Sequence, residues 1–98
     1  MLEIPVAELE KICTKYGLKE LALFGSAIRD DFTETSDVDV LVEPGPTTPR
    51  GYFALSQLED DLERVFGRTV DVVTPGALSP YIRDEVLRSR RSVYVATH

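Results

Sequence analysis

Short apolar runs bounded by glycine, proline or polar turn residues alternate along this chain with segments of helical periodicity. The apolar runs span residues 20–24, 37–43 and 69–73, and their length and flanking turn residues are typical of strands. Apolar residues recur three and four positions apart in 6–16 and 52–66, and a glycine follows each segment, which predicts two amphipathic helices. The alternation predicts an α/β (α+β) fold, in which a small mixed twisted sheet carries helices mainly on one face.

The remaining segments predict shorter elements. A tight turn precedes a short helix over residues 27–32. Pro80 predicts the first position of a further helix, which continues over 81–89 and directs Ile82 and Val86 toward the core. Residues 92–96 form a possible last strand at the edge of the sheet.

Length and charge restrict the classes of function. The 98 residues suffice for one hydrophobic core, so we expect a single domain over residues 1–98. The net charge of -6 opposes stable binding to a phosphate backbone, so we expect no direct nucleic-acid partner. The lone Cys13 lies on the apolar stripe of the first helix and is expected in the core. Without a signal-peptide pattern or an apolar run long enough for a membrane span, we expect a cytoplasmic protein with no membrane partner.

Three aspartates stand inside apolar strand segments. Asp37 and Asp39 are two residues apart, and both project to one side because side chains alternate faces along a strand. Asp71 lies in the third apolar run, and if that strand pairs alongside, the three carboxylates converge. Like charges about 4 Å apart repel by roughly 4 kcal/mol per pair at an effective dielectric near 20. Stability alone therefore does not explain the cluster.

Two interpretations of these aspartates remain. In one, Asp37, Asp39 and Asp71 bind a hard divalent cation that is shared with substrate phosphates. In the other, Asp37 caps a turn, Asp39 faces water on the open side of the sheet, and Asp71 interrupts an aggregation-prone valine run. The segment that precedes them favours the metal.

Gly25 and Ser26 stand where an apolar strand turns into a helix, ten residues before Asp37. Glycine allows the backbone to approach a ligand, and the N–H groups of the first helical turn with the Ser26 hydroxyl form a phosphate seat. Arg29 lies one turn further on, within reach of the same phosphates. Each residue alone is typical of a helix cap or a solvated arginine. Their combination with an Asp-x-Asp pair favours a nucleotide site.

A family signature is formed by Phe24-Gly25-Ser26, the ten-residue gap and the segment 36–42, which reads Ser-Asp-Val-Asp-Val-Leu-Val. These motifs resemble the polymerase-beta-like nucleotidyltransferase superfamily, specifically its minimal nucleotidyltransferase (MNT) branch, and Asp71 matches the third carboxylate of that family. The similarity covers nearly the whole chain. The sequence departs from many relatives at Ala27, where they have a basic residue, and at Asp30, where they have glycine. The missing cation bears on triphosphate affinity and rate rather than on the reaction type.

The resemblance implies a polymerase-beta-like nucleotidyltransferase fold and a Mg²⁺-dependent transfer of a nucleoside monophosphate from a nucleoside triphosphate, ATP, to a hydroxyl. It implies nucleotide-binding residues Gly25, Ser26 and Arg29, and catalytic, metal-binding residues Asp37, Asp39 and Asp71. By this carry-over, the glycine and serine hold the β,γ-phosphates, and the first two aspartates bind metal that bridges to the triphosphate. The third aspartate binds a second metal and helps to activate the acceptor hydroxyl.

Members of the MNT branch are typically antitoxins encoded beside a HEPN ribonuclease toxin, and some add AMP to a tyrosine of that toxin. The resemblance therefore predicts a protein adenylyltransferase that neutralises a HEPN toxin. We expect the acceptor on another molecule, because the catalytic sheet and its helices use all 98 residues. Two alternatives remain: an antitoxin that inhibits the toxin by binding alone, and a small-molecule nucleotidyltransferase that builds its pocket with a dimer partner.

Two further groups of side chains allow more than one interpretation: Arg83, Arg88, Arg90 and Arg91 near the C-terminus, and Tyr52 with Phe53 after the Pro-Gly-rich segment. The arginines either neutralise triphosphate, contact a partner or form a solvated helix end, and the solvated end is favoured. The two aromatic residues either stack on adenine or pack in the core, and core packing is favoured.

Overall fold

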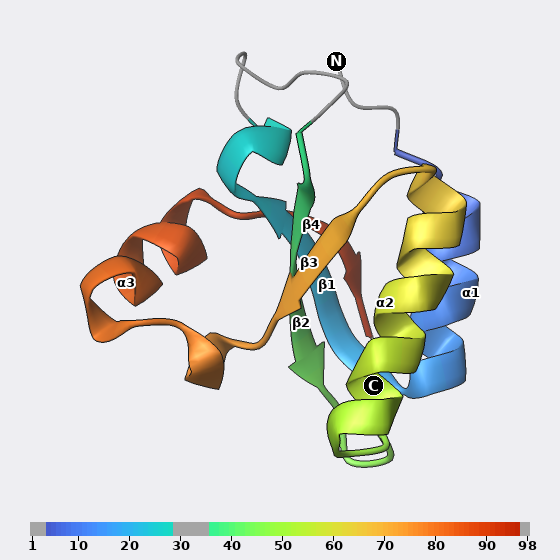
Figure 1. Ribbon diagram of the computed structural model, residues 1–98. Helices are drawn as coiled ribbons and strands as arrows, with labels where there is room; N and C mark the ends of the chain where they lie inside the picture. The colour runs from blue at the N-terminus through green and yellow to red at the C-terminus, as the bar shows by residue number, and fades with distance from the viewer. Residues whose placement is uncertain (1–3, 29–35, 97–98) are drawn as a thin grey trace.

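The computed structural model describes residues 4–28 and 36–96, which form a four-stranded mixed sheet with helices on both sides (Figure 1). The helices are α1 (Val6–Tyr16), α2 (Tyr52–Phe66) and α3 (Pro80–Ser89), with the short 3-10 helices η1 (Gly25–Ile28) and η2 (Pro75–Ala77). The strands are β1 (Leu18–Phe24), β2 (Val38–Pro44), β3 (Val70–Val73) and β4 (Arg91–Val95). Their order across the sheet is β3-β2-β1-β4, with β2 and β3 parallel and the other neighbours antiparallel.

The main core lies between the sheet and the pair α1 and α2, which share one side of the sheet (Figure 1). Alternation along the strands directs one set of buried side chains to this side: Leu21, Leu23, Val38, Val40, Val42, Val70 and Val72. They pack against Leu9 and Cys13 of α1 and Leu58 and Leu62 of α2. The apolar stripes of both helices and the core position of Cys13 are therefore confirmed.

The opposite side of the sheet carries a smaller cluster and helix α3. Ala22 and Leu41 are buried there, and Val86 and Leu87 of α3 pack against them. No residue of α3 is fully buried, and Ile82 is 48% exposed. The prediction that Ile82 faces the core is wrong, because α3 approaches the sheet through its C-terminal half.

The predicted fold class is confirmed, with differences at the boundaries of elements. The strand predicted from residue 20 begins at Leu18, and the possible last strand is present as β4. The short helix predicted over 27–32 begins earlier, as η1, and residues 29–32 lie outside the described part of the chain. None of the helices in residues 4–28 and 36–96 has the length and apolar character needed to cross a bilayer.

Candidate functional site

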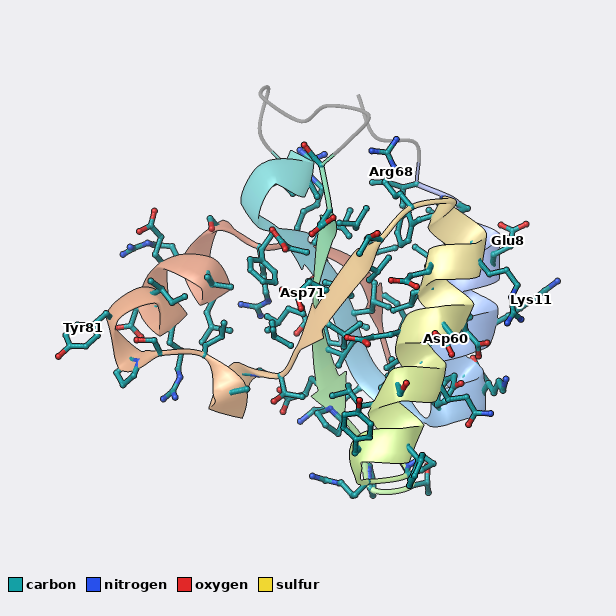
Figure 2. All side chains as sticks on the ribbon, in the orientation of Figure 1. Glu8, Lys11, Asp60, Arg68, Asp71 and Tyr81 are labelled. Carbon is teal, nitrogen blue, oxygen red and sulfur yellow. The ribbon has the colours of Figure 1, made fainter. Side chains whose placement is uncertain are left out.

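Asp39 and Asp71 lie side by side on the neighbouring parallel strands β2 and β3. The two residues are direct partners in the register, and the valines before and after each of them point into the main core. Both carboxylates therefore project from the opposite face. Asp39 is partly buried and Asp71 is exposed. Figure 2 shows Asp71 on β3, the strand at one edge of the sheet, on the side away from α2.

Gly25 brings the backbone against the carboxylate of Asp39. Phe24, the last residue of β1, is the register partner of Asp39, so the chain turns into η1 directly beside that side chain. Gly25 has a φ of +64°, which L side chains rarely adopt, and a Cβ added there would collide with Oδ2 of Asp39. The backbone conformation favours glycine at this position, and any larger residue would displace the carboxylate of Asp39.

The remaining predicted site residues flank this contact. Ser26 follows Gly25 within η1, so its backbone lies at the same turn. Asp37 is exposed and directly precedes β2. Arg29 lies outside the described residues. The structure thus brings Gly25, Asp39 and Asp71 together, whereas the assignment of site roles to all six residues stays a prediction.

The donor atoms at this site suit a hard cation that is shared with a substrate. Within the described part of the chain, no group of three or more His, Cys, Asp or Glu side chains is placed to hold a metal ion. Mg²⁺ commonly takes one or two carboxylates and completes its shell with water and substrate phosphates. The in-register pair Asp39 and Asp71 offers such carboxylates, and the absence of a side chain at Gly25 leaves space beside them. The residues therefore fit Mg²⁺ bound together with a triphosphate.

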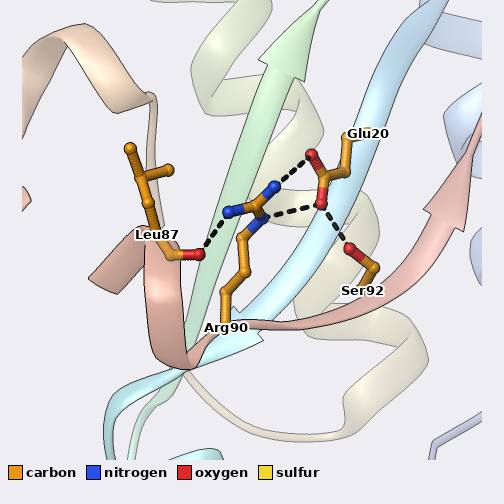
Figure 3. A network of polar contacts seen from close by, with 4 residues as sticks. All are labelled: Glu20, Leu87, Arg90 and Ser92. Atoms are coloured by element: carbon orange, nitrogen blue, oxygen red, sulfur yellow. Dashed lines mark hydrogen bonds and ion pairs between the residues drawn. The ribbon is translucent and has the colours of Figure 1, made fainter. Parts of the chain in front are cut away.

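A polar network holds the end of α3 and β4 against β1 (Figure 3). Arg90 Nε donates a hydrogen bond to Glu20 Oε2 at 2.9 Å, and its Nη1 donates to the carbonyl of Leu87. The Ser92 hydroxyl donates to the same Glu20 oxygen. Burial alone would raise the pKa of Glu20, but the hydrogen bonds from Arg90 and Ser92 and the charge of Arg90 lower it overall. This network ties the end of α3 to the sheet, on the side from which Asp39 and Asp71 project.

The other arginines near the C-terminus divide between structural and solvated roles. Arg83 Nη2 donates to the carbonyl of Leu78 at 2.9 Å, which ties the start of α3 to the segment before it. Arg88 and Arg91 are exposed, as expected for a solvated helix end. The prediction of a wholly solvated arginine group is wrong for Arg83 and Arg90, because Arg83 bonds a carbonyl in the turn before α3 and Arg90 bonds Glu20, which is 70 positions away in the sequence.

Tyr52 and Phe53 do not pack in the core. They are 80% and 86% exposed, and their rings contact each other edge to face with centroids 6.0 Å apart. Figure 1 shows the first turn of α2 beyond the end of β2, at the periphery of the molecule. The favoured prediction of core packing is therefore wrong for both.

A cleft between η1 and α3 is not predictable from the sequence. Two of its lining residues, Ile82 and Glu85, stand in a pattern of mixed polarity that is ordinary for a surface helix. The spacing of Ile82 and Val86 predicts core positions for both, whereas Ile82 is half exposed.

Comparison with known proteins identifies the family. The model of the nucleotidyltransferase domain family matches residues 7–93. The protein adenylyltransferase MntA of Thermococcus cleftensis is 33% identical over 96 residues, which cover 90% of this chain and 95% of that protein.

Solved structures agree with this result. A structure provisionally identified as a minimal nucleotidyltransferase is 29% identical and has a TM-score of 0.73, covering 92% of this chain and 88% of the other. A crystal structure of a toxin–antitoxin with AMP-PNP has the same fold, with a TM-score of 0.76 at 19% identity, and covers 96% of this chain and 76% of that one. The resemblance seen in the motifs is confirmed: the chain belongs to the nucleotidyltransferase domain family.

Proposed function

We propose that this protein is an antitoxin that transfers AMP from ATP to a tyrosine hydroxyl of a cognate HEPN ribonuclease toxin and thereby neutralises it. The observation that carries the proposal is the in-register pair Asp39 and Asp71 beside the side-chain-free turn at Gly25. Two comparisons support the proposal. One relative, matched over 95% of its length, is named protein adenylyltransferase, and a toxin–antitoxin structure with AMP-PNP has the same fold.

We infer the roles of the residues from their order across the sheet. The turn at Gly25 and Ser26 takes the β- and γ-phosphates, which places the α-phosphorus over Asp39 and the acceptor on the side of Asp71. Asp39 and Asp71 would hold Mg²⁺ together with the triphosphate, and Asp37, directly before β2, is the further carboxylate that the motif predicts for metal binding. Bound Mg²⁺ neutralises charge on the triphosphate and stabilises the charge that develops on the entering and leaving oxygens.

The reaction is an in-line displacement at the α-phosphorus. The acceptor oxygen forms a bond to the α-phosphorus while the bond to the oxygen that bridges to the β-phosphate breaks, and pyrophosphate leaves. The phenolic proton passes to Asp71, which is exposed to solvent and exchanges it with water. The protein contributes position and electrostatics rather than a covalent intermediate.

The proposal is tested with the full chain, its cognate toxin, ATP and Mg²⁺. We expect the toxin to gain the mass of one or more AMP groups, and we expect Asp39→Asn and Asp71→Asn to lower this transfer about 100-fold or more. Glu43→Gln is the matched control, because it removes one carboxylate from the same strand four residues away from Asp39. Addition of EDTA is expected to stop the reaction, and excess Mg²⁺ to restore it.

Two outcomes would reject the proposal. An unchanged toxin mass under conditions in which a known adenylyltransferase modifies its own substrate would exclude AMP transfer. Full protection of cells from the toxin by Asp39→Asn would instead indicate an antitoxin that inhibits by binding alone.

A further inference from the structure

The two edges of the sheet differ in how well they can accept a further strand. β4 forms one edge, and a register shift opposite Leu21 and Ala22 leaves Val93 as an extra residue in it. Such a bulge twists an edge strand and hinders the addition of another strand. β3 forms the other edge, and its register with β2 is regular over residues 70–73. β3 is therefore the edge to which a strand can be added.

Alternate residues of β3 direct their backbone groups toward this edge. The Val38 N–H donates to the carbonyl of Thr69 at 2.9 Å. Bonds of this kind recur at every second residue of a parallel ladder, so the backbone of Asp71 also bonds to β2. The N–H and C=O groups of Val70 and Val72 therefore point away from β2. In Figure 1 no described helix or strand lies over β3 on the side of the viewer.

The chain closes only the start of this edge. The Glu63 carboxylate of α2 accepts a hydrogen bond from the Val70 N–H at 3.1 Å, which occupies the first outward donor. Among the described residues none bonds to the N–H or C=O of Val72 across the edge. The backbone groups of Val72, directly after Asp71, are therefore left for a partner strand.

A strand added at Val72 would extend a row of side chains that runs across the candidate site. Phe24, Asp39 and Asp71 are successive register partners across β1, β2 and β3, and they share one face of the sheet. In an antiparallel pair that is hydrogen-bonded at Val72, the next residue of the added strand lies directly opposite Asp71. The Cβ atoms of such cross-strand neighbours are about 4.5–5.5 Å apart. The side chain at this position becomes the fourth member of the row.

The chemistry of this fourth position fits the acceptor of the proposed reaction. That reaction needs a hydroxyl beside Asp71, on the side opposite the phosphates at Gly25. A tyrosine opposite Asp71 presents its hydroxyl from this side, and an aromatic side chain is long enough to reach past its direct neighbour. A polypeptide acceptor can also bond to the backbone groups of Val72, as peptides do when they add to a sheet edge.

We propose that the acceptor segment of the toxin is extended and adds to β3 as a fifth strand of the sheet, with its tyrosine opposite Asp71. This inference rests on the proposed function, because it takes transfer of AMP to a tyrosine of a protein as given. It assigns recognition of the acceptor to backbone groups at the sheet edge rather than to side chains of the catalytic motif.

The first test compares two substitutions at Val72 in the full chain, with the cognate toxin, ATP and Mg²⁺. Val72→Pro and Val72→Ala both remove a buried valine side chain, but only proline removes the N–H at the edge. We expect the KM for the toxin to be about fivefold to tenfold higher in Val72→Pro than in Val72→Ala, because one hydrogen bond is lost. The affinities of the two variants for a non-hydrolysable ATP analogue are expected to be equal.

The second test leaves the protein unchanged and uses synthetic peptides of the toxin, centred on the tyrosine that is modified. A methyl group on the backbone nitrogen of the residue before the tyrosine blocks its bond to the Val72 C=O. A methyl group on the nitrogen of the tyrosine itself is the control, because that N–H points away from β3. We expect the first peptide to have a KM about fivefold to tenfold above that of the second.

Each result decides the inference. Equal KM values for the toxin in the two Val72 variants, or equal effects of the two methyl groups, would overturn it. An unmethylated peptide that stays unmodified while the whole toxin gains AMP would overturn it as well. If urea titration shows that Val72→Pro does not fold, the peptides decide alone.

Two further outcomes separate this inference from its alternatives. Dimers of the chain alone that Val72→Pro dissociates would assign the edge to a second copy instead of the toxin. Wild-type protein that transfers no AMP to the toxin rejects the proposed function, whereas transfer that does not depend on the edge contradicts only the added strand.

Discussion

Replacement of Gly25 by alanine separates the two reasons for glycine at the catalytic turn. Gly25 has a φ of +64°, and a left-handed conformation costs an L residue about 1–2 kcal/mol. The added Cβ would also collide with Oδ2 of Asp39, so the carboxylate must move away from its position. A displacement of about 1 Å at a catalytic group costs about 100-fold in rate.

Gly67 provides a matched control for the backbone effect. Its φ is +70°, and a Cβ added there meets nothing within 4 Å. We expect Gly25→Ala and Gly67→Ala to lower the free energy of unfolding by similar amounts, with a decrease of about 4–8 °C in Tm for each kcal/mol. Only Gly25→Ala is expected to lose AMP transfer, by about 100-fold.

The assay measures AMP transfer to the toxin well below the Tm of both variants, after urea titration has given their free energies of unfolding. Wild-type activity in Gly25→Ala would refute the reasoning, since the carboxylate of Asp39 would then not need the space. Equal loss of activity in Gly67→Ala would refute it as well, because backbone strain without a collision would suffice.

Two further predictions concern stability and reactivity. Glu20→Gln is expected to lower the free energy of unfolding by about 1 kcal/mol at neutral pH, because partly buried Arg90 loses its carboxylate partner. The folded state lowers the pKa of Glu20 below its ordinary 4.5, so this stabilisation is present above pH 4.5 and is lost as the pH falls through the folded pKa. Urea titrations of both proteins should therefore show a gap at neutral pH that shrinks as the pH is lowered below 4.5, and a gap that stays constant would contradict the ion pair. Burial raises the pKa of the Cys13 thiol to about 12, so the thiol of the native protein should resist iodoacetamide and react only after unfolding. Mass spectrometry measures the alkylation. Rapid alkylation of the native protein would contradict this prediction and show that α1 opens.

The alternation of valine and aspartate made much of the candidate site predictable. In residues 38–42 and 70–72 a period of two assigns the valines to the main core, so the aspartates between them must face the other way. The glycine after β1 was likewise recognisable as a place of close backbone approach. These are local signals, and the structure reproduces the arrangement that they imply.

Contacts between distant segments were not predictable in the same way. The register that sets Asp39 opposite Asp71 depends on how two strands align across helix α2, which no local pattern encodes. The ion pair of Glu20 and Arg90 joins residues 70 positions apart. The exposure of Tyr52 depends on where α2 begins relative to the sheet. In each case the fold as a whole, rather than the local sequence, determines the contacts and the exposure of the side chain.

The parallel register of β2 and β3 also determines which insertions and deletions this protein can tolerate. Added or lost residues between Pro44 and Tyr52 change a surface segment and leave the phase of both strands intact. One residue inserted within β3 before Asp71 would instead turn this aspartate toward α2. Length variation among functional relatives should therefore gather in connections such as the one before α2 and be absent from the β3 residues 70–73.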